Sequence, residues 1–312
     1  MNFTLAFVSF FIGIVVGLTG MGGGALMTPV LVLFFGIQPL AAVSSDLVAS
    51  AIMKPFGSAV HLRHGTVQLG LVKWLCLGSV PGAFCGVLLL RALGSGDQLQ
   101  SLVKTALGVV LVFAATTLIV KAYLTMVQRV RRRATGERLV QAEGGRVVVK
   151  PLPTVIIGAV GGLVVGMTSV GSGSLIIVAL ILLYPTLQAS QLVGTDLVQA
   201  VPLVMSAALG HILFGDFKLG LTTSLMLGSV PGVLVGATFS SRAPGGVIRR
   251  ALALVLLASG LKLLNLSNVA LAVVLGIVIV IGPPLWMAAR KRNGLPPLAR
   301  AEGARGQDVP AA

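Results

Sequence analysis

The segment GLTGMGGGALMTP, from Gly17 to Pro29, places five glycines inside a stretch that is otherwise apolar. Glycine costs about 1 kcal/mol relative to alanine in a helix interior, so a cluster of this density predicts a break in a helix. A related segment, GMTSVGSGSLIIV from Gly166 to Val178, interrupts a second apolar run in the same way. We therefore expect two Gly-rich hairpins of broken or re-entrant helix, one in each half of the chain.

The composition places both hairpins in a membrane protein. Of 312 residues, 56% are hydrophobic and 10% are charged, against about 25% charged in ordinary soluble domains. Apolar runs follow one another along the chain, and most are long enough to cross about 30 Å of hydrocarbon as a helix. This excludes a soluble enzyme, a disordered chain and a secreted disulfide scaffold. It predicts an all-α polytopic integral membrane protein with about 8 to 11 membrane segments.

The two halves of the chain repeat each other. LGSVPG at 77–82 recurs without change at 227–232, which is 150 residues later. At the same spacing, Asp46 corresponds to Asp196. Uncommon residues that recur in one register indicate a duplicated membrane unit.

Basic residues indicate how the two halves are oriented. With the basic loop 125–150 in the cytoplasm, the loop 61–67 also falls inside and is basic, whereas its repeat partner 211–217 falls outside and carries no arginine. The halves are therefore interpreted as inverted-topology repeats, an architecture of secondary transporters. Arg91 and Lys104 fall on the predicted outer side and are the main exceptions to this charge pattern.

We predict five parts along the chain. They are a first membrane repeat (1–124), a basic cytoplasmic linker (125–152), a second membrane repeat (153–264), a final transmembrane helix (265–289) and a basic, disordered cytoplasmic tail (290–312). Much of the net charge of +15 lies in the linker and the tail. We interpret it as a positive-inside signal that places the C-terminus in the cytoplasm, and not as a nucleic-acid surface.

The two glycine hairpins predict an anion site. Broken backbone at membrane depth needs protein or a water-filled cavity around it, and the start of a half-helix presents N–H groups to an anion. Hydroxyl groups and a lysine in the neighbouring apolar runs would add donors. The predicted substrate-binding residues are Gly22, Gly23, Gly24, Ser44, Ser45, Lys54, Gly171, Ser172, Gly173, Ser174 and Thr195. Close helix packing through small residues is the alternative interpretation of the glycines.

Three charged residues lie within or close to the apolar runs. Burial of a carboxylate in the bilayer costs free energy unless the group is paired, protonated or hydrated. We therefore interpret Asp46 and Asp196 first as functional residues. Proton coupling is the functional interpretation, and capping of a helix N-terminus is the alternative. Lys54 has no counterpart in the second half. It binds the anion, pairs with an aspartate, or extends its stem to the membrane interface, and the last interpretation is favoured.

These motifs together resemble the TauE/SafE family, the sulfite- and sulfonate-permease-like group of membrane transporters. The resemblance rests on GLTGMGGGALMTP at Gly17–Pro29, on GIQPLAAVSSDLVAS at Gly36–Ser50, and on the HLRHG, LGSVPG and VGTDLVQA elements. It covers most of residues 3–264. It implies a carrier in the bacterial cytoplasmic (inner) membrane for small sulfur-containing or carboxylate anions. The sequence departs from the family pattern at Asp46 and Asp196.

We therefore predict a secondary transporter that moves a small sulfur oxyanion, an organosulfonate or a carboxylate, with Asp46 and Asp196 carrying protons. The expected partners are the anion, protons and the lipid bilayer. A homodimer is left open, and no nucleic acid, cofactor or metal is expected. The alternatives are a cation or metal permease that uses the same two aspartates, and a membrane assembly factor. Because the spans contain no P-loop and no nucleophile–base pair, we expect no enzymatic activity.

Overall fold

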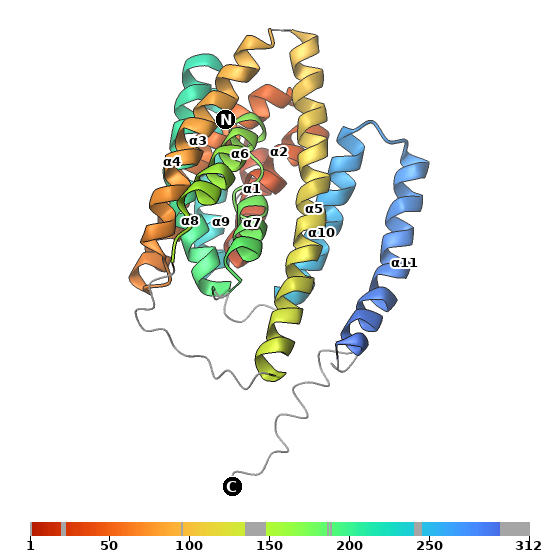
Figure 1. Cartoon of the computed structure of the whole chain (residues 1–312). Coiled ribbons are helices and arrows are strands. Elements are labelled where there is room, and N and C mark those ends of the chain that lie inside the picture. Colours follow the sequence, from red (N-terminus) through yellow and green to blue (C-terminus); the bar gives the residue numbers. More distant parts are fainter. Residues whose placement is uncertain are drawn as a thin grey trace. The chain divides into compact units, whose positions relative to one another are not determined.

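The computed structural model describes residues 2–19, 23–94, 96–134, 148–185, 187, 189–239 and 245–293. Every regular element in these ranges is a helix, which confirms the predicted all-α fold (Figure 1). The helices are α1 (Phe3–Thr19), α2 (Gly24–Leu33), α3 (Pro39–Arg63), α4 (Leu69–Ala92), α5 (Asp97–Ala134), α6 (Pro151–Thr168), α7 (Leu175–Leu183), α8 (Ala189–Phe214), α9 (Leu219–Phe239), α10 (Gly245–Leu263) and α11 (Asn268–Arg292).

Six of the described helices are long and apolar enough to cross a membrane. They are α4, α6 and α11 over their whole lengths, and α5, α8 and α9 over Asp97–Val127, Ser190–Phe214 and Leu219–Gly236. Helices α2 and α7 have 10 and 9 residues. At 1.5 Å per residue each covers about half of the hydrocarbon thickness. Each follows a glycine hairpin, as expected for a helix that the glycines interrupt.

Helix α5 extends past the predicted end of the first membrane repeat at 124. It continues to Ala134, so residues 125–134 of the predicted linker are helical. Residues 125–134 contain no glycine or proline, and their basic side chains favour the negative end of a helix dipole. Residues 135–147 of the predicted linker lie outside the described residues, as does the predicted tail from 294.

The chain divides into two compact units. One contains Met1–Lys121 and Arg146–Asn265, and the other contains Ala122–Gly145 and Leu266–Ala312. The first unit holds α1–α4, most of α5 and α6–α10, and therefore both glycine hairpins. All the contacts described below lie within it.

Glycine-lined contacts connect the two halves within the first unit. Glycines at every fourth position of α4, from Gly78 to Gly86, lie directly against the backbone of α6 from Val155 to Leu163. Their repeat partners in α9, from Gly228 to Gly236, lie in the same way against the backbone of α1. A Cβ atom at these glycines would overlap backbone atoms of the neighbouring helix, so small residues permit this close approach. The first helix of each half thus packs against the fourth helix of the other half.

Helices α3 and α8 show that the repeats are inverted. They occupy equivalent positions in the two halves, yet they run antiparallel. Ser44, near the start of α3, hydrogen-bonds to His211, near the end of α8. Ser58, near the end of α3, donates to the carbonyl oxygen of Leu197, near the start of α8. Equivalent helices that point in opposite directions are the mark of an inverted-topology repeat.

Candidate functional site

The two glycine hairpins contact each other. Gly24, the first residue of α2, lies so close to Ser169 that a Cβ atom on Gly24 would overlap the Ser169 backbone carbonyl. Ser169 ends α6 in a left-handed conformation with φ of 60°, which turns the chain away from the helix axis. Gly20, Met21 and Gly22 lie outside the described residues, so the predicted site residue Gly22 is not placed.

Asp46 receives hydrogen bonds from both halves of the chain. The hydroxyl of Ser169, from the second hairpin, donates to Asp46 Oδ2. Thr28 Oγ1, from α2, donates to the same oxygen at 3.4 Å. The aspartate is 2% exposed. Helix α3 begins at Pro39, so Asp46 lies inside the helix and does not cap its N-terminus.

Asp196 occupies the equivalent place in the second half, but its surroundings differ. Gln199 Nε2 donates to Asp196 Oδ1 at 3.4 Å, and the backbone of Gly173 also hydrogen-bonds to this carboxylate. The carbonyl of the same glutamine accepts from Ser79 Oγ at 3.1 Å. A polar chain therefore leads from α4 through Gln199 to Asp196. Helix α8 begins at Ala189, so the capping interpretation does not describe Asp196 either.

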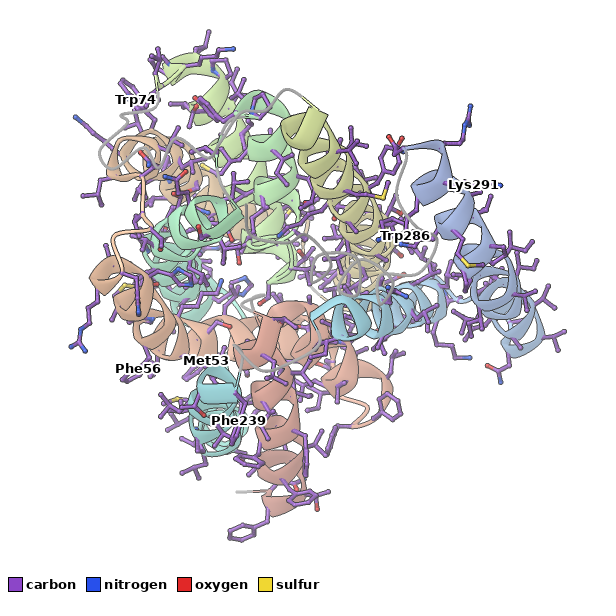
Figure 2. The ribbon with its side chains drawn as sticks, turned by 90° about the horizontal axis from the view of Figure 1, so that it is seen from below. Met53, Phe56, Trp74, Phe239, Trp286 and Lys291 are labelled. Atoms are coloured by element: carbon purple, nitrogen blue, oxygen red, sulfur yellow. The ribbon has the colours of Figure 1, made fainter. Side chains whose placement is uncertain are left out.

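Lys54 brings a positive charge to these two acids. Its Nζ atom donates to Ser172 Oγ at 2.6 Å, and its side chain is 6% exposed. The ammonium also interacts electrostatically with Asp46 and Asp196. The favoured sequence interpretation, in which Lys54 reaches the membrane interface, is therefore wrong. Phe56, two residues along α3, is 51% exposed and lies at the periphery of Figure 2.

The second hairpin lines a small cavity. Its walls are formed by Ser169, by residues 171–174, and by Ala25 and Leu256. Its volume is about 10 Å³, which is room for about one water molecule. The hydroxyls of Ser172 and Ser174 belong to side chains that are only 7% exposed. The hairpin site is therefore closed in this structure to any group much larger than a water molecule.

The structure gathers most of the predicted site residues and leaves others apart. The residues that lie at the hairpins or contact them are Gly23, Gly24, Asp46, Lys54, Gly171, Ser172, Gly173, Ser174 and Asp196. The Ser44 hydroxyl instead bonds to His211 Nδ1 at 2.7 Å, and Thr195 Oγ1 accepts from the backbone N–H of Gln68 at 3.0 Å. The Ser45 hydroxyl is buried and has no hydrogen-bond partner among the described residues.

Three residues of the site, Thr28, Ser169 and Gln199, are not among the predicted site residues. Thr28 and Ser169 lie within the two glycine-rich segments, and that location could have identified them. Gln199 has no such signal, because the first half carries Ala49 in its place. Within the described residues, no group of three His, Cys, Asp or Glu side chains could hold a metal ion.

Comparisons with known proteins agree with this architecture. Residues 5–263 match a family model described as "Sulfite exporter TauE/SafE". The Bacillus subtilis (strain 168) protein named "Probable membrane transporter protein YjnA" is 40% identical over 265 residues, which cover 85% of this chain and 100% of that relative. A second protein of that organism, "Probable membrane transporter protein YdhB", is 27% identical over 263 residues, or 82% of this chain and 98% of the relative. No solved structure matches the chain.

Proposed function

The chain belongs to the sulfite exporter TauE/SafE family, and from that membership we propose that it is a proton-coupled secondary transporter of a small anion. The anion is a sulfur oxyanion, an organosulfonate or a carboxylate, and the membrane is the bacterial cytoplasmic membrane. The names of the relatives support transport in general. The chemistry of the buried hairpin site supports the choice of an anion.

The contact between Lys54 and Ser172 is the observation that carries this proposal. A buried ammonium that bonds to a hydroxyl of a broken helix offers one positive charge together with hydrogen-bond donors. Charge-assisted hydrogen bonds of this kind are the strong contacts for oxyanions. An oxygen of the substrate would take the place of Ser172 Oγ on the lysine, and the N–H groups of the hairpins would bind the other oxygens.

The two aspartates supply a reason for proton coupling. When Asp46 and Asp196 are ionised, each carboxylate repels an arriving anion, and Lys54 offsets this repulsion only in part because it interacts with both acids, while Lys121 acts on Asp196 alone. Protonation of one carboxylate removes that repulsion, so the proton and the anion each favour the binding of the other. Thermodynamic linkage makes this coupling reciprocal. The expected transport cycle moves the anion together with at least one proton.

The inverted repeats supply a mechanism of access. The hairpins meet at Gly24 and Ser169, and the cavity beside them admits about one water molecule. Alternating access in inverted-repeat transporters is largely a rigid-body movement of one repeat against the other around the site. Separation of the hairpins on one side and then on the other would expose Lys54 to each compartment in turn.

A cation permease is the weaker candidate for the same site. The positive charge of Lys54 lies with both aspartates, so a divalent cation that used these carboxylates as ligands would be repelled. Binding to the purified protein separates the two functions. Sulfite, thiosulfate or sulfoacetate should raise the melting temperature, and divalent metal ions should not.

Uptake by proteoliposomes tests the proposal directly. The Lys54→Gln variant should take up labelled sulfite, thiosulfate or sulfoacetate at least about tenfold more slowly than the wild type, because it loses a charge-assisted contact. Lys73→Gln is the matched control, since Lys73 is an exposed lysine of α4, and it should transport normally. Wild-type rates in Lys54→Gln would refute the proposal, and so would a wild type that takes up neither these anions nor a labelled carboxylate such as acetate.

A further inference from the structure

A second and larger cavity lies at the other end of α8. It has a volume of about 400 Å³ and is formed where α3 and α5 begin and where α4 and α8 end. The link between α4 and α5 lies at the top of Figure 1. The polar lining of the cavity consists of Arg91, His211 and Asp216. The volume of the cavity is within the range of small-molecule sites. The hairpin site does not include any of these residues.

Arg91 is held in place within this cavity. Its guanidinium carbon lies 4.5 Å from the centroid of the Phe214 ring, a cation–π contact. Phe214 is itself packed edge-to-face against Phe84, with 6.2 Å between ring centroids. The aromatic face holds the guanidinium plane and leaves its N–H groups available for a ligand in the cavity. Asp216 also lines the cavity, and its carboxylate pairs with Lys218 at 3.7 Å.

His211 connects this cavity to the hairpin site. Its Nε2 atom lies 2.7 Å from the carbonyl oxygen of Gly166, which can only accept, so Nε2 carries the hydrogen. Its Nδ1 atom lies 2.7 Å from Ser44 Oγ. Gly166 lies in α6, three residues before Ser169. Ser44 lies in α3, two residues before Asp46. Both partners of the histidine are therefore close in sequence to residues of the hairpin site. The histidine is fully buried and lines the larger cavity.

We propose that this cavity is an entry site where Arg91 binds the oxyanion before it reaches the hairpins. This inference rests on the proposed function and extends it to a second binding site. A guanidinium matches the geometry of a sulfonate, sulfite or carboxylate group by donating two parallel hydrogen bonds. Arg91 is the basic side chain of this lining, and a positive charge at a concave surface attracts anions. Binding of the anion would explain why Arg91 lies at the end of α4 that is predicted to face outward. The positive-inside pattern disfavours a basic residue on that side.

A lipid headgroup offers the same oxyanion chemistry as a soluble anion. Basic residues near helix ends also bind anionic lipid phosphates. We assign the cavity to the soluble anion because its wall, His211, bonds to the two elements that carry the hairpin site. The test below separates the two sources.

The experiment is sulfite uptake by proteoliposomes over a range of sulfite concentrations. Arg91→Gln should raise the half-saturating concentration about tenfold and leave the maximal rate within about twofold, because the variant loses a charge-assisted contact at entry only. Lys104→Gln is the control, since Lys104 belongs to the same predicted side and bonds to Asn265 instead. Phe214→Leu, which removes the aromatic support but keeps the arginine, should raise the half-saturating concentration by a smaller factor.

The outcomes separate the entry site from the proposed function. A wild type that takes up neither the sulfur anions nor a labelled carboxylate such as acetate refutes both. A wild type that transports, with Arg91→Gln and Phe214→Leu unchanged in half-saturating concentration, refutes only the entry site. The measurements are made in phosphatidylcholine vesicles with and without phosphatidylglycerol. An Arg91 effect that occurs only with the anionic lipid assigns the cavity to a headgroup and overturns the inference.

Discussion

Lys54 Nζ lies 2.6 Å from Ser172 Oγ, so a helix of the first repeat bonds through its lysine to the broken helix of the second. The partners are 118 positions apart in the chain. The same hairpin reaches Asp46 through Ser169 and Asp196 through the backbone of Gly173. One turn of irregular backbone thus contacts Asp46, Lys54 and Asp196, and the predictions below test this hairpin site.

Removal of the Ser172 hydroxyl should weaken both the fold and the substrate site. Ser172→Ala leaves the buried ammonium of Lys54 without this acceptor, at an expected cost of about 1–3 kcal/mol in the free energy of unfolding. Thermal unfolding in detergent measures the change. Thr105→Ala is the control, because that hydroxyl is exposed and bonds only to its own helix at the Ser101 carbonyl. Equal melting temperatures for the two variants would contradict the role given to this contact.

Neutralisation of either buried aspartate should abolish coupling to protons. In Asp46→Asn and Asp196→Asn, uptake of labelled sulfite should no longer rise when the pH on the entry side falls, because the side chain can no longer take up a proton. Exchange of sulfite across the membrane without a pH gradient should persist. In the wild type, acid on the entry side should accelerate uptake, since protonation removes repulsion of the anion.

Asp97→Asn is the control for this measurement. Asp97 is exposed at the start of α5 and lines neither cavity, so its loss should leave the pH dependence unchanged. If sulfite uptake by both Asp46→Asn and Asp196→Asn still rose normally with acid on the entry side, the aspartates would not be the proton-coupling groups.

Gly24→Ala should force the two hairpins apart. The added Cβ atom would overlap the backbone carbonyl of Ser169, which cannot move aside as a flexible side chain could. We expect a loss of about 2–3 kcal/mol or a failure to fold, as for overpacking of a well-packed core. Gly57→Ala in α3 is the matched control, since nothing lies within 4 Å of its added Cβ atom. That change should be neutral or stabilising by up to about 1 kcal/mol, and thermal unfolding compares the two.

The closed hairpin site predicts slow access of polar reagents. In a variant with Ser172→Cys, Cys76→Ser and Cys85→Ser, a negatively charged methanethiosulfonate should label the new thiol slowly, because the neighbouring cavity admits about one water molecule. Transported sulfoacetate, which does not react with the reagent, should accelerate labelling by separating the hairpins. Labelling that is fast and unaffected by sulfoacetate would show that the site is open at rest.

Much of the fold could be predicted from local features. Runs of apolar residues determine where helices cross a membrane, because their length must match the hydrocarbon thickness. Glycine clusters determine where helices break, and the duplicated LGSVPG element reveals the two repeats. Hydropathy indicates where an apolar run ends and not where a helix ends, and α5 continues through good helix formers to Ala134.

The sequence by itself therefore determined the membrane class, the inverted repeat, the broken helices and the presence of Asp46, Lys54 and Asp196 in apolar runs. Only the tertiary structure decided which side chains meet. Ser44 and Lys54 share α3, yet one bonds to His211 and the other to the second hairpin. The physical reason is that partners across two halves depend on the rotation and register of packed helices. Those are determined by close contacts such as Gly24 against Ser169, and not by spacing along one helix.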